Sequence, residues 1–141
     1  LKNLFKTSMG KYINPEVIEE KFRESKFIEN IVVFGEGQKF AAALIDPNQN
    51  YMQAWKKSNN KKNNKKGEDV SDELTDADIK AILTSEVKKY NAFFGDTEQI
   101  KKFEIINDTW TVENGLMTPT LKVKRKVVEQ RYKDLIDSMF E

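Results

Sequence analysis

Two apolar runs near the start of the chain restrict its fold more than any other feature. They span residues 28–34 and 40–45, and the loop between them reads Gly-Glu-Gly-Gln-Lys. Apolar runs of this length, bounded by glycine, are typical of strands buried in a sheet. We therefore expect two neighbouring central strands joined by a hairpin loop. Phosphate binding by this Gly-x-Gly loop is the weaker interpretation, because no helix follows it directly.

A short hairpin and a helix precede these strands. Residues 4–8 read as a strand and Gly10 allows a turn into a second one, so we expect a two-stranded hairpin within residues 1–13. Asn14 and Pro15 predict a helix start, because asparagine is a favoured N-cap and proline fits the first helical position.

Two more helices and a third strand complete the predicted core. Thr75 is the expected cap of a helix, with Asp78 as its capping-box partner and Gly95 as its stop. Residues 100–106 read as a strand, and residues 127–139 repeat apolar side chains at helical spacing. We predict an α+β fold: an N-terminal two-stranded hairpin and a sheet of about three strands, packed with three helices.

Residues 56–75 are the segment without a clear place in this core. Six lysines lie among asparagines at residues 56–66, and six acidic residues follow at residues 68–78. Because the lysine block has no apolar side chain to bury, we predict a flexible insertion after a short helix at residues 50–55. No aromatic residues alternate with these lysines, so we do not predict nucleic-acid binding.

Composition excludes several kinds of chemistry. The 141 residues include 24 basic and 23 acidic side chains but no cysteine and no histidine, which excludes thiolate nucleophiles, disulfides and histidine-based triads. The acidic residues show no metal-ligand spacing, so we predict no metal site. No apolar run is long enough to span a bilayer. Since the chain opens on Leu1 rather than methionine, we expect it to be a piece of a longer protein.

One lysine near the end of the chain is a candidate for chemistry. Asn114 and Gly115 predict a hairpin-like reversal, and Pro119 stiffens the backbone after it. Lys122 lies between two aliphatic residues, so we expect its stem to be packed and its ammonium to be fixed. Such a charge suits a phosphate or a developing oxyanion. An ordinary surface lysine is the alternative.

Two motifs resemble the small C-terminal domain of the adenylate-forming enzymes, and specifically that of the long-chain fatty acyl-CoA synthetases. Residues 1–19 read LKNLFKTSMGKYINPEVIE, similar to the family's hinge, glycine turn and helix start. Residues 116–125 read LMTPTLKVKR, similar to the late catalytic-lysine motif of the long-chain branch. The order and separation of the motifs also fit, and the resemblance covers nearly all of the chain except residues 56–75.

The resemblance implies roles for five residues in two half-reactions. A carboxylate first attacks the α-phosphate of ATP, and coenzyme A then displaces AMP from the acyl-adenylate. Lys122 matches the catalytic lysine of the first step, and Lys2 matches the hinge about which the domain rotates. Gly10 matches the loop glycine beside the pantetheine path, and Lys6 a contact with the nucleotide or the domain interface. Lys11 follows in the same loop as a further cofactor-binding candidate.

The same resemblance implies partners that lie outside the chain. We expect a large N-terminal domain of the same enzyme, with ATP, coenzyme A and a long-chain fatty acid as substrates and magnesium bound mainly outside this domain. Residues 1–141 alone should fold without catalysing. We expect the enzyme in the cytoplasm, and peripheral contact with a membrane stays open.

Two departures from the family pattern bear on these assignments. The loop is one residue longer between Lys6 and Gly10 than in several aryl and short-chain relatives. Leu121 stands where those relatives have glycine, which favours the long-chain branch. Two alternatives remain: an adenylating enzyme with another acid or acceptor, and a non-catalytic interaction module. The module would dock the lysine block on an acidic surface or an anionic membrane.

Overall fold

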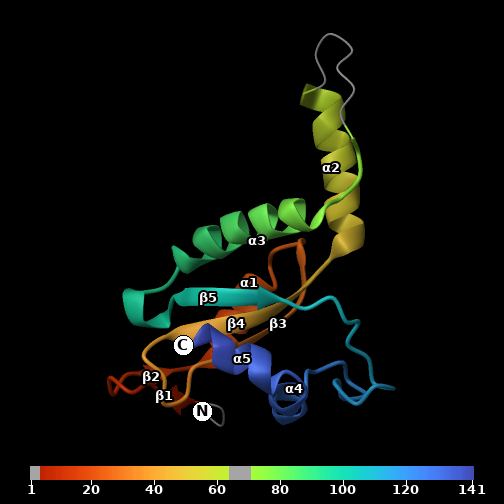
Figure 1. Cartoon of the computed structure of the whole chain (residues 1–141). Helices are drawn as coiled ribbons and strands as arrows, with labels where there is room; N and C mark the ends of the chain where they lie inside the picture. The colour runs from red at the N-terminus through yellow and green to blue at the C-terminus, as the bar shows by residue number, and fades with distance from the viewer. Residues whose placement is uncertain (1–3, 64–70) are drawn as a thin grey trace.

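A mixed three-stranded sheet forms the centre of the molecule (Figure 1). The computed structural model describes residues 4–63 and 71–141. The strands are ordered β3-β4-β5, with β3 antiparallel and β5 parallel to the central β4. Their bounds are β3 (Ile28–Phe34), β4 (Ala41–Pro47) and β5 (Ile100–Ile105). Both apolar runs are therefore strands, and the predicted α+β fold is confirmed.

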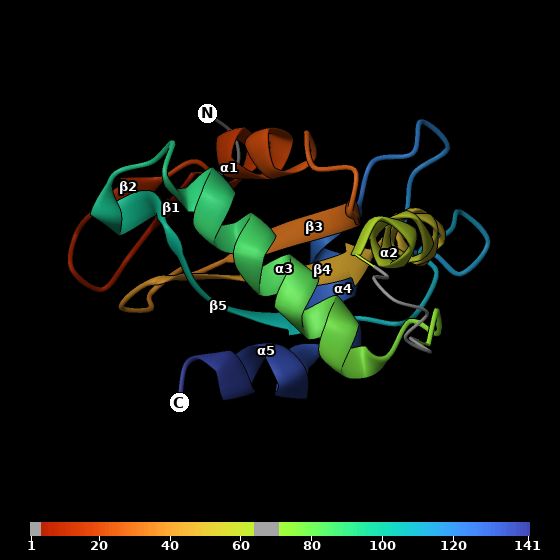
Figure 2. The same ribbon diagram turned by 90° about the horizontal axis from the view of Figure 1, so that it is seen from above.

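Two separate apolar cores lie on the two faces of this sheet. Along β4, Ala41, Ala43 and Ile45 face one core, while Ala42 and Leu44 face the other, as the two-residue period of a strand requires. The first core includes α1 (Pro15–Phe22) and α3 (Asp76–Asn91), and the second includes α4 (Arg125–Arg131) and α5 (Lys133–Met139). Figure 2 shows α3 running diagonally across the sheet, with α1 beside β3.

The caps of α1 and α3 are those that the sequence predicts. Asn14 Oδ1 accepts the Glu16 N–H at 3.1 Å, ahead of Pro15 at the start of α1. Thr75 and Asp78 form a reciprocal capping box at the start of α3. The C-terminal helix instead divides at Tyr132, whose φ of −115° and ψ of 27° are not helical. Partly for this reason, the described residues contain five α-helices rather than three.

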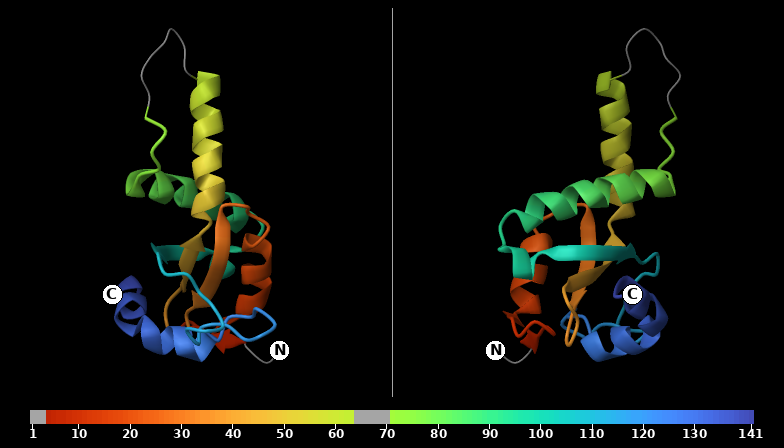
Figure 3. Two further views of the ribbon diagram at one scale, coloured as in Figure 1. Left: turned by 90° about the vertical axis from the view of Figure 1, so that its right-hand side faces the viewer. Right: turned by 60° about the vertical axis from the view of Figure 1, so that its left-hand side comes forward.

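Helix α2 (Gln49–Asn63) is longer than the predicted helix at residues 50–55 and projects away from the sheet (Figure 3). Polar contacts hold the returning chain against it. Asn60 Nδ2 donates to Ser71 O and to Asp72 Oδ1, both at 2.9 Å. The Lys56 ammonium donates a hydrogen bond to the Asp78 carboxylate. This bond is the main reason why the pKa of Asp78 is lowered to about 2. Flexibility of residues 56–75 stays a prediction, and residues 64–70 lie outside the described ones.

The N-terminal hairpin packs on the loop between β3 and β4. Its strands are β1 (Phe5–Lys6) and β2 (Tyr12–Ile13). Ser8 N–H donates to Gln38 O, and Gly37 N–H donates to Lys6 O, both at 2.9 Å. Gly35 lies under the Phe5 ring, where an added Cβ would come within 2.8 Å of Phe5 Cε1. The glycine loop at residues 35–39 is thus a hairpin loop against which β1 packs.

The close contact at Gly35 predicts a loss of stability on adding one methyl group. Gly35→Ala should lower the free energy of unfolding by about 2 kcal/mol, because the Phe5 ring and the Phe40 carbonyl both oppose a Cβ. Urea denaturation would measure the loss. Gly95→Ala is the matched control, since nothing lies within 4 Å of a Cβ there and its φ is ordinary. Equal stability of the two variants would contradict this packing.

Asp46 is a buried carboxyl at the end of β4, and it predicts a pH dependence. Asn30 Nδ2 donates to it at 3.0 Å, but burial raises its pKa from 3.8 to about 6. The folded state then binds a proton more tightly than the unfolded state, so stability should fall as pH rises from about 4 to about 6. Asp46→Asn should flatten that dependence and raise stability at pH 7 by about 1 kcal/mol. Thermal melts of both proteins across this pH range would test the prediction. The same dependence of melting temperature on pH in Asp46→Asn as in wild type would contradict it.

Candidate active site

The predicted catalytic lysine lies on a tight loop that leads into α4. Met117 and Val123 form an antiparallel bridge, which closes the loop at its base. Inside the bridge, Thr118 N–H donates to Lys122 O at 2.7 Å, and Thr118 Oγ1 accepts the Lys122 N–H at 3.1 Å. The chain therefore reverses at residues 118–122, around Pro119.

The Asn-Gly pair lies in a tight turn, as predicted. Gly115 has φ 82°, and its N–H donates to Val112 O at 3.1 Å. Asn114 Oδ1 accepts the N–H groups of Thr111 and Leu116 at 3.1 and 3.2 Å. The chain reverses here, since Met117 N–H donates to Thr111 O at 3.1 Å across the turn, but no strands pair on its two sides among the described residues.

The side chain of Lys122 is exposed, so its stem is not packed as the sequence suggested. Leu121 has φ 61°, in the left-handed region, which interrupts the strand-like alternation expected around the lysine. As a result Leu121 is itself 69% exposed and does not enclose the stem. Within residues 4–63 and 71–141, the Lys122 ammonium makes no hydrogen bond or ion pair. It is available to a ligand.

The loop forms one wall of a groove of about 1020 Å³. Helix α1 and the outer edge of β3 form the rest of it. Lys122, Lys124 and Lys126 line the groove from the loop and the start of α4, while Glu16 and Glu20 line it from α1. The groove therefore presents positive charge from the loop wall and mixed charge from the α1 wall, where Arg23 also lines it.

A buried ion pair closes the groove beside the loop. Arg125 Nη2 donates to both carboxylate oxygens of Glu19, at 2.9 and 2.8 Å. Val33 N–H donates to Glu19 Oε2 at 2.8 Å, and Arg125 Nη1 donates to Val33 O at 2.6 Å. Burial raises the pKa of Glu19, and the Arg125 charge opposes that rise. Since β3 is an edge strand, the pair satisfies backbone groups that have no neighbouring strand.

The other predicted site residues lie on the N-terminal hairpin. Lys6 and Lys11 are both exposed, and Lys6 Nζ lies 5.6 Å from the centre of the Tyr12 ring. Gly10 has φ 80°, and the nearest atom to an added Cβ would be Lys6 Cε at 4.0 Å, so the space above it is open. Lys2, the predicted hinge residue, lies outside the described residues.

The structure does not bring Lys122 into one site with the predicted residues of the hairpin. The hairpin and the segment that carries Lys122 lie on opposite sides of the molecule in Figures 1 and 2. Any reaction that uses both must present one and then the other to the reacting groups.

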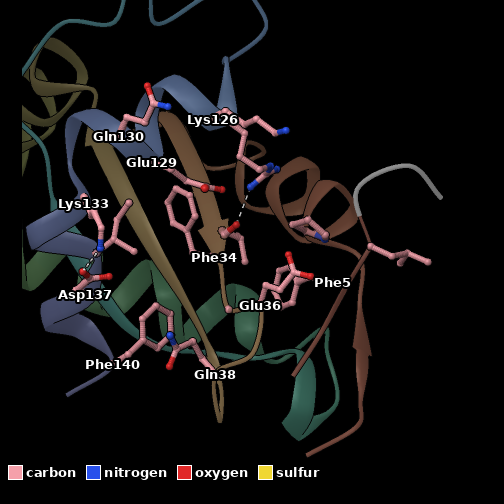
Figure 4. A pocket seen from close by; sticks show the side chains of 16 residues that line it. Phe5, Phe34, Glu36, Gln38, Lys126, Glu129, Gln130, Lys133, Asp137 and Phe140 are labelled. Atoms are coloured by element: carbon pink, nitrogen blue, oxygen red, sulfur yellow. Dashed lines mark hydrogen bonds and ion pairs between the residues drawn. The ribbon is translucent and has the colours of Figure 1, made fainter. Parts of the chain in front are cut away.

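A second cavity, of about 510 Å³, lies between the hairpin, the β3–β4 loop and the last two helices. Figure 4 shows Phe34 and Phe140 among its lining side chains, with the Lys133–Asp137 ion pair at 2.7 Å. None of the predicted site residues that the structure describes lines this cavity. The sequence gives little sign of it, because its lining residues are spread over residues 4–140.

The chain matches one known protein family over nearly its whole length. The family is the AMP-binding enzyme C-terminal domain, and the match runs over residues 3–141. The chain belongs to this family. With this membership, the resemblance read from the two motifs is confirmed at the level of the domain, while the roles of individual residues stay predictions.

Individual relatives of this AMP-binding enzyme C-terminal domain are named as long-chain fatty acid ligases. Long-chain-fatty-acid–CoA ligase FadD15 of Mycobacterium tuberculosis is 34% identical over 139 residues, which are 99% of this chain and 23% of that protein. Long-chain-fatty-acid–[acyl-carrier-protein] ligase AEE15 of Arabidopsis thaliana is 30% identical over 139 residues, covering 99% and 17%. The chain thus spans less than a quarter of the length of these relatives.

A solved structure supports the fold. The adenylation domain of a carboxylate reductase from Mycobacterium chelonae superposes with a TM-score of 0.76 at 17% identity, covering 99% of this chain and 19% of that one. No helix among the described residues is both long and apolar enough to cross a membrane.

The buried ion pair predicts a large difference between two basic residues. Arg125→Met should cost about 3 kcal/mol of stability, because it leaves the buried Glu19 carboxylate without its ion-pair partner and the Val33 carbonyl without its donor. Lys133→Met removes an exposed ion pair, whose side chains are 72% and 56% exposed, and should cost almost nothing. Urea denaturation of both variants would compare them, and similar midpoints would show that the buried pair contributes little.

Proposed function

We propose that this chain is the catalytic lid of an AMP-forming long-chain fatty acid–CoA ligase. The enzyme would activate a fatty acid with ATP to an acyl-adenylate and then transfer the acyl group to coenzyme A. Family membership and the similarity to a long-chain-fatty-acid–CoA ligase over 139 residues support the proposal. The observation that carries it is the ammonium of Lys122, which has no partner in the described part of the chain and lies on a closed loop beside a groove.

Lys122 has the chemistry that the first half-reaction requires. When a carboxylate oxygen attacks the α-phosphate, the bond to pyrophosphate breaks and negative charge builds on the oxygens around phosphorus. A positioned ammonium stabilises that charge without transferring a proton. Lys122 suits this role because it is exposed and no acidic side chain among the described residues neutralises it.

The hairpin has the properties that the second half-reaction requires. Coenzyme A must bring a thiolate to the acyl carbonyl, and AMP then leaves. The open space above Gly10 would admit the pantetheine arm, with Lys6 and Lys11 beside it to meet phosphate groups. Because the hairpin lies opposite the Lys122 loop, we propose that the domain rotates about Lys2 between the two steps.

We assign the rest of the machinery to a large N-terminal domain. That domain would hold the adenine and acyl pockets and most of the contacts to magnesium, so residues 1–141 alone should not catalyse. Thioester formation by the isolated chain with ATP, palmitate and coenzyme A would contradict this. Peripheral contact of the whole enzyme with a membrane stays a proposal.

A different acyl acceptor is the second candidate. The relative AEE15 is named for ligation to acyl-carrier protein and is 30% identical to this chain. Both candidates use Lys122 in the same way and differ only in the thiol that accepts the acyl group. Comparing coenzyme A with acyl-carrier protein as acceptor for supplied palmitoyl-adenylate would separate them. The interaction-module alternative has less support, since Lys56, the first lysine of the block, is already paired with Asp78.

Lys122→Ala in the full-length enzyme should separate the two half-reactions. Pyrophosphate release with ATP and palmitate should fall by about a hundredfold or more, because one preorganised contact to the developing charge is lost. Coenzyme A-dependent consumption of supplied palmitoyl-adenylate should continue at the original rate. Lys124→Ala, in the same groove, is the matched control and should keep both activities. Unchanged pyrophosphate release in Lys122→Ala would reject the assignment.

A further inference from the structure

The position of the Lys122 ammonium depends on the backbone beneath it. Its side chain is exposed and has no partner among the described residues, so packing does not hold it in place. What the protein controls is where the Cα of Lys122 lies and which way its Cα–Cβ bond points. The loop at residues 118–122 determines both.

One side chain closes this loop. Thr118 Oγ1 accepts the Lys122 N–H at 3.1 Å, while Thr118 N–H donates to Lys122 O at 2.7 Å. The Thr118 carbonyl also accepts the Leu121 N–H at 2.8 Å. Thr118 therefore bonds both backbone groups of the lysine, and its hydroxyl is the only side-chain group of the described residues that bonds the Lys122 N–H.

The loop holds a conformation that its sequence does not favour. Leu121 has φ 61°, a region that side chains with a Cβ rarely adopt, and its own side chain is 69% exposed and gains little from packing. A strained residue persists only where its surroundings determine its conformation. Thr118 supplies that restraint, because its carbonyl accepts the Leu121 N–H and its hydroxyl accepts the N–H of the next residue, Lys122.

We propose that Thr118 is a positioning residue for the adenylation step, acting through Lys122. The inference rests on the proposed role of Lys122 and adds the device that holds the lysine ready. Removing the hydroxyl frees the Lys122 N–H and lets Leu121 relax toward an ordinary conformation. The ammonium then reaches the α-phosphate from a wider range of positions, and the rate of the step falls.

The test compares Thr118→Val, which replaces the hydroxyl by a methyl group, with Thr118→Ser, which keeps it. In the full-length enzyme, Thr118→Val should lower the kcat of pyrophosphate release with ATP and palmitate about tenfold. The KM for both substrates, the melting temperature and thioester formation from palmitoyl-adenylate should stay close to wild type. Thr118→Ser should recover most of the rate. Thr84→Val, the same change on the exposed face of α3, should have no effect.

Two further measurements separate positioning from a general structural role. Thr118→Val combined with Lys122→Ala should be no slower in adenylation than Lys122→Ala alone, because the proposed effect of the hydroxyl on this step passes through the lysine and not through its other bond, to the Thr120 hydroxyl. Amide exchange at Lys122 should also be faster in Thr118→Val than in wild type. Equal losses in both half-reactions, or additive losses in the double variant, would overturn the proposal.

The proposal and the function it rests on can fail separately. If Lys122→Ala abolishes adenylation and Thr118→Val leaves it unchanged, Thr118 has no positioning role and the proposed function stands. If Lys122→Ala leaves adenylation unchanged, both the function of the lysine and the role of Thr118 are rejected.

Discussion

The buried pair of Glu19 and Arg125 is the interaction on which the arrangement of this domain depends. It joins α1, the outer edge of β3 and the first residue of α4, which are far apart in the sequence. Arg125 lies three residues after Lys122, so the pair also fixes the end of the loop that carries the lysine. A charge pair that is removed from water is stable only if its geometry is good and if further hydrogen bonds satisfy its remaining polar atoms. Here Val33 supplies two such bonds: its N–H donates to Glu19 and its carbonyl accepts from Arg125.

The domain separates a rigid centre from two working surfaces. The sheet is packed on both faces, whereas Lys122 and the hairpin turn at residues 8–11 are exposed. The hairpin is anchored by Phe5 and Ile13 in the first core and by backbone hydrogen bonds to the β3–β4 loop, and the segment before Lys122 is anchored by Leu116 and Met117 in the second core. In the proposed alternation, both exposed surfaces would move together with this centre.

Local sequence was enough to predict the elements that local chemistry determines. The apolar runs of β3 and β4, the Asn14 cap and the Thr75 capping box each depend on neighbouring residues. The prediction failed where distant residues decide. Helix α2 extends into a block without apolar residues because Asn60 and Lys56 meet the returning chain, and the left-handed Leu121 interrupts the expected packing of Lys122. The Glu19–Arg125 pair, 106 residues apart, had no local signal.

The covering of β3 also bears on how the folded chain behaves at high concentration. An uncovered strand edge offers N–H and carbonyl groups that can pair with a strand of another molecule. At Val33 both groups are already engaged by side chains, which leaves that stretch of the edge without bonding capacity for a neighbour. The pair at the end of the proposed catalytic loop therefore also makes one position of the β3 edge unavailable to a strand of another copy.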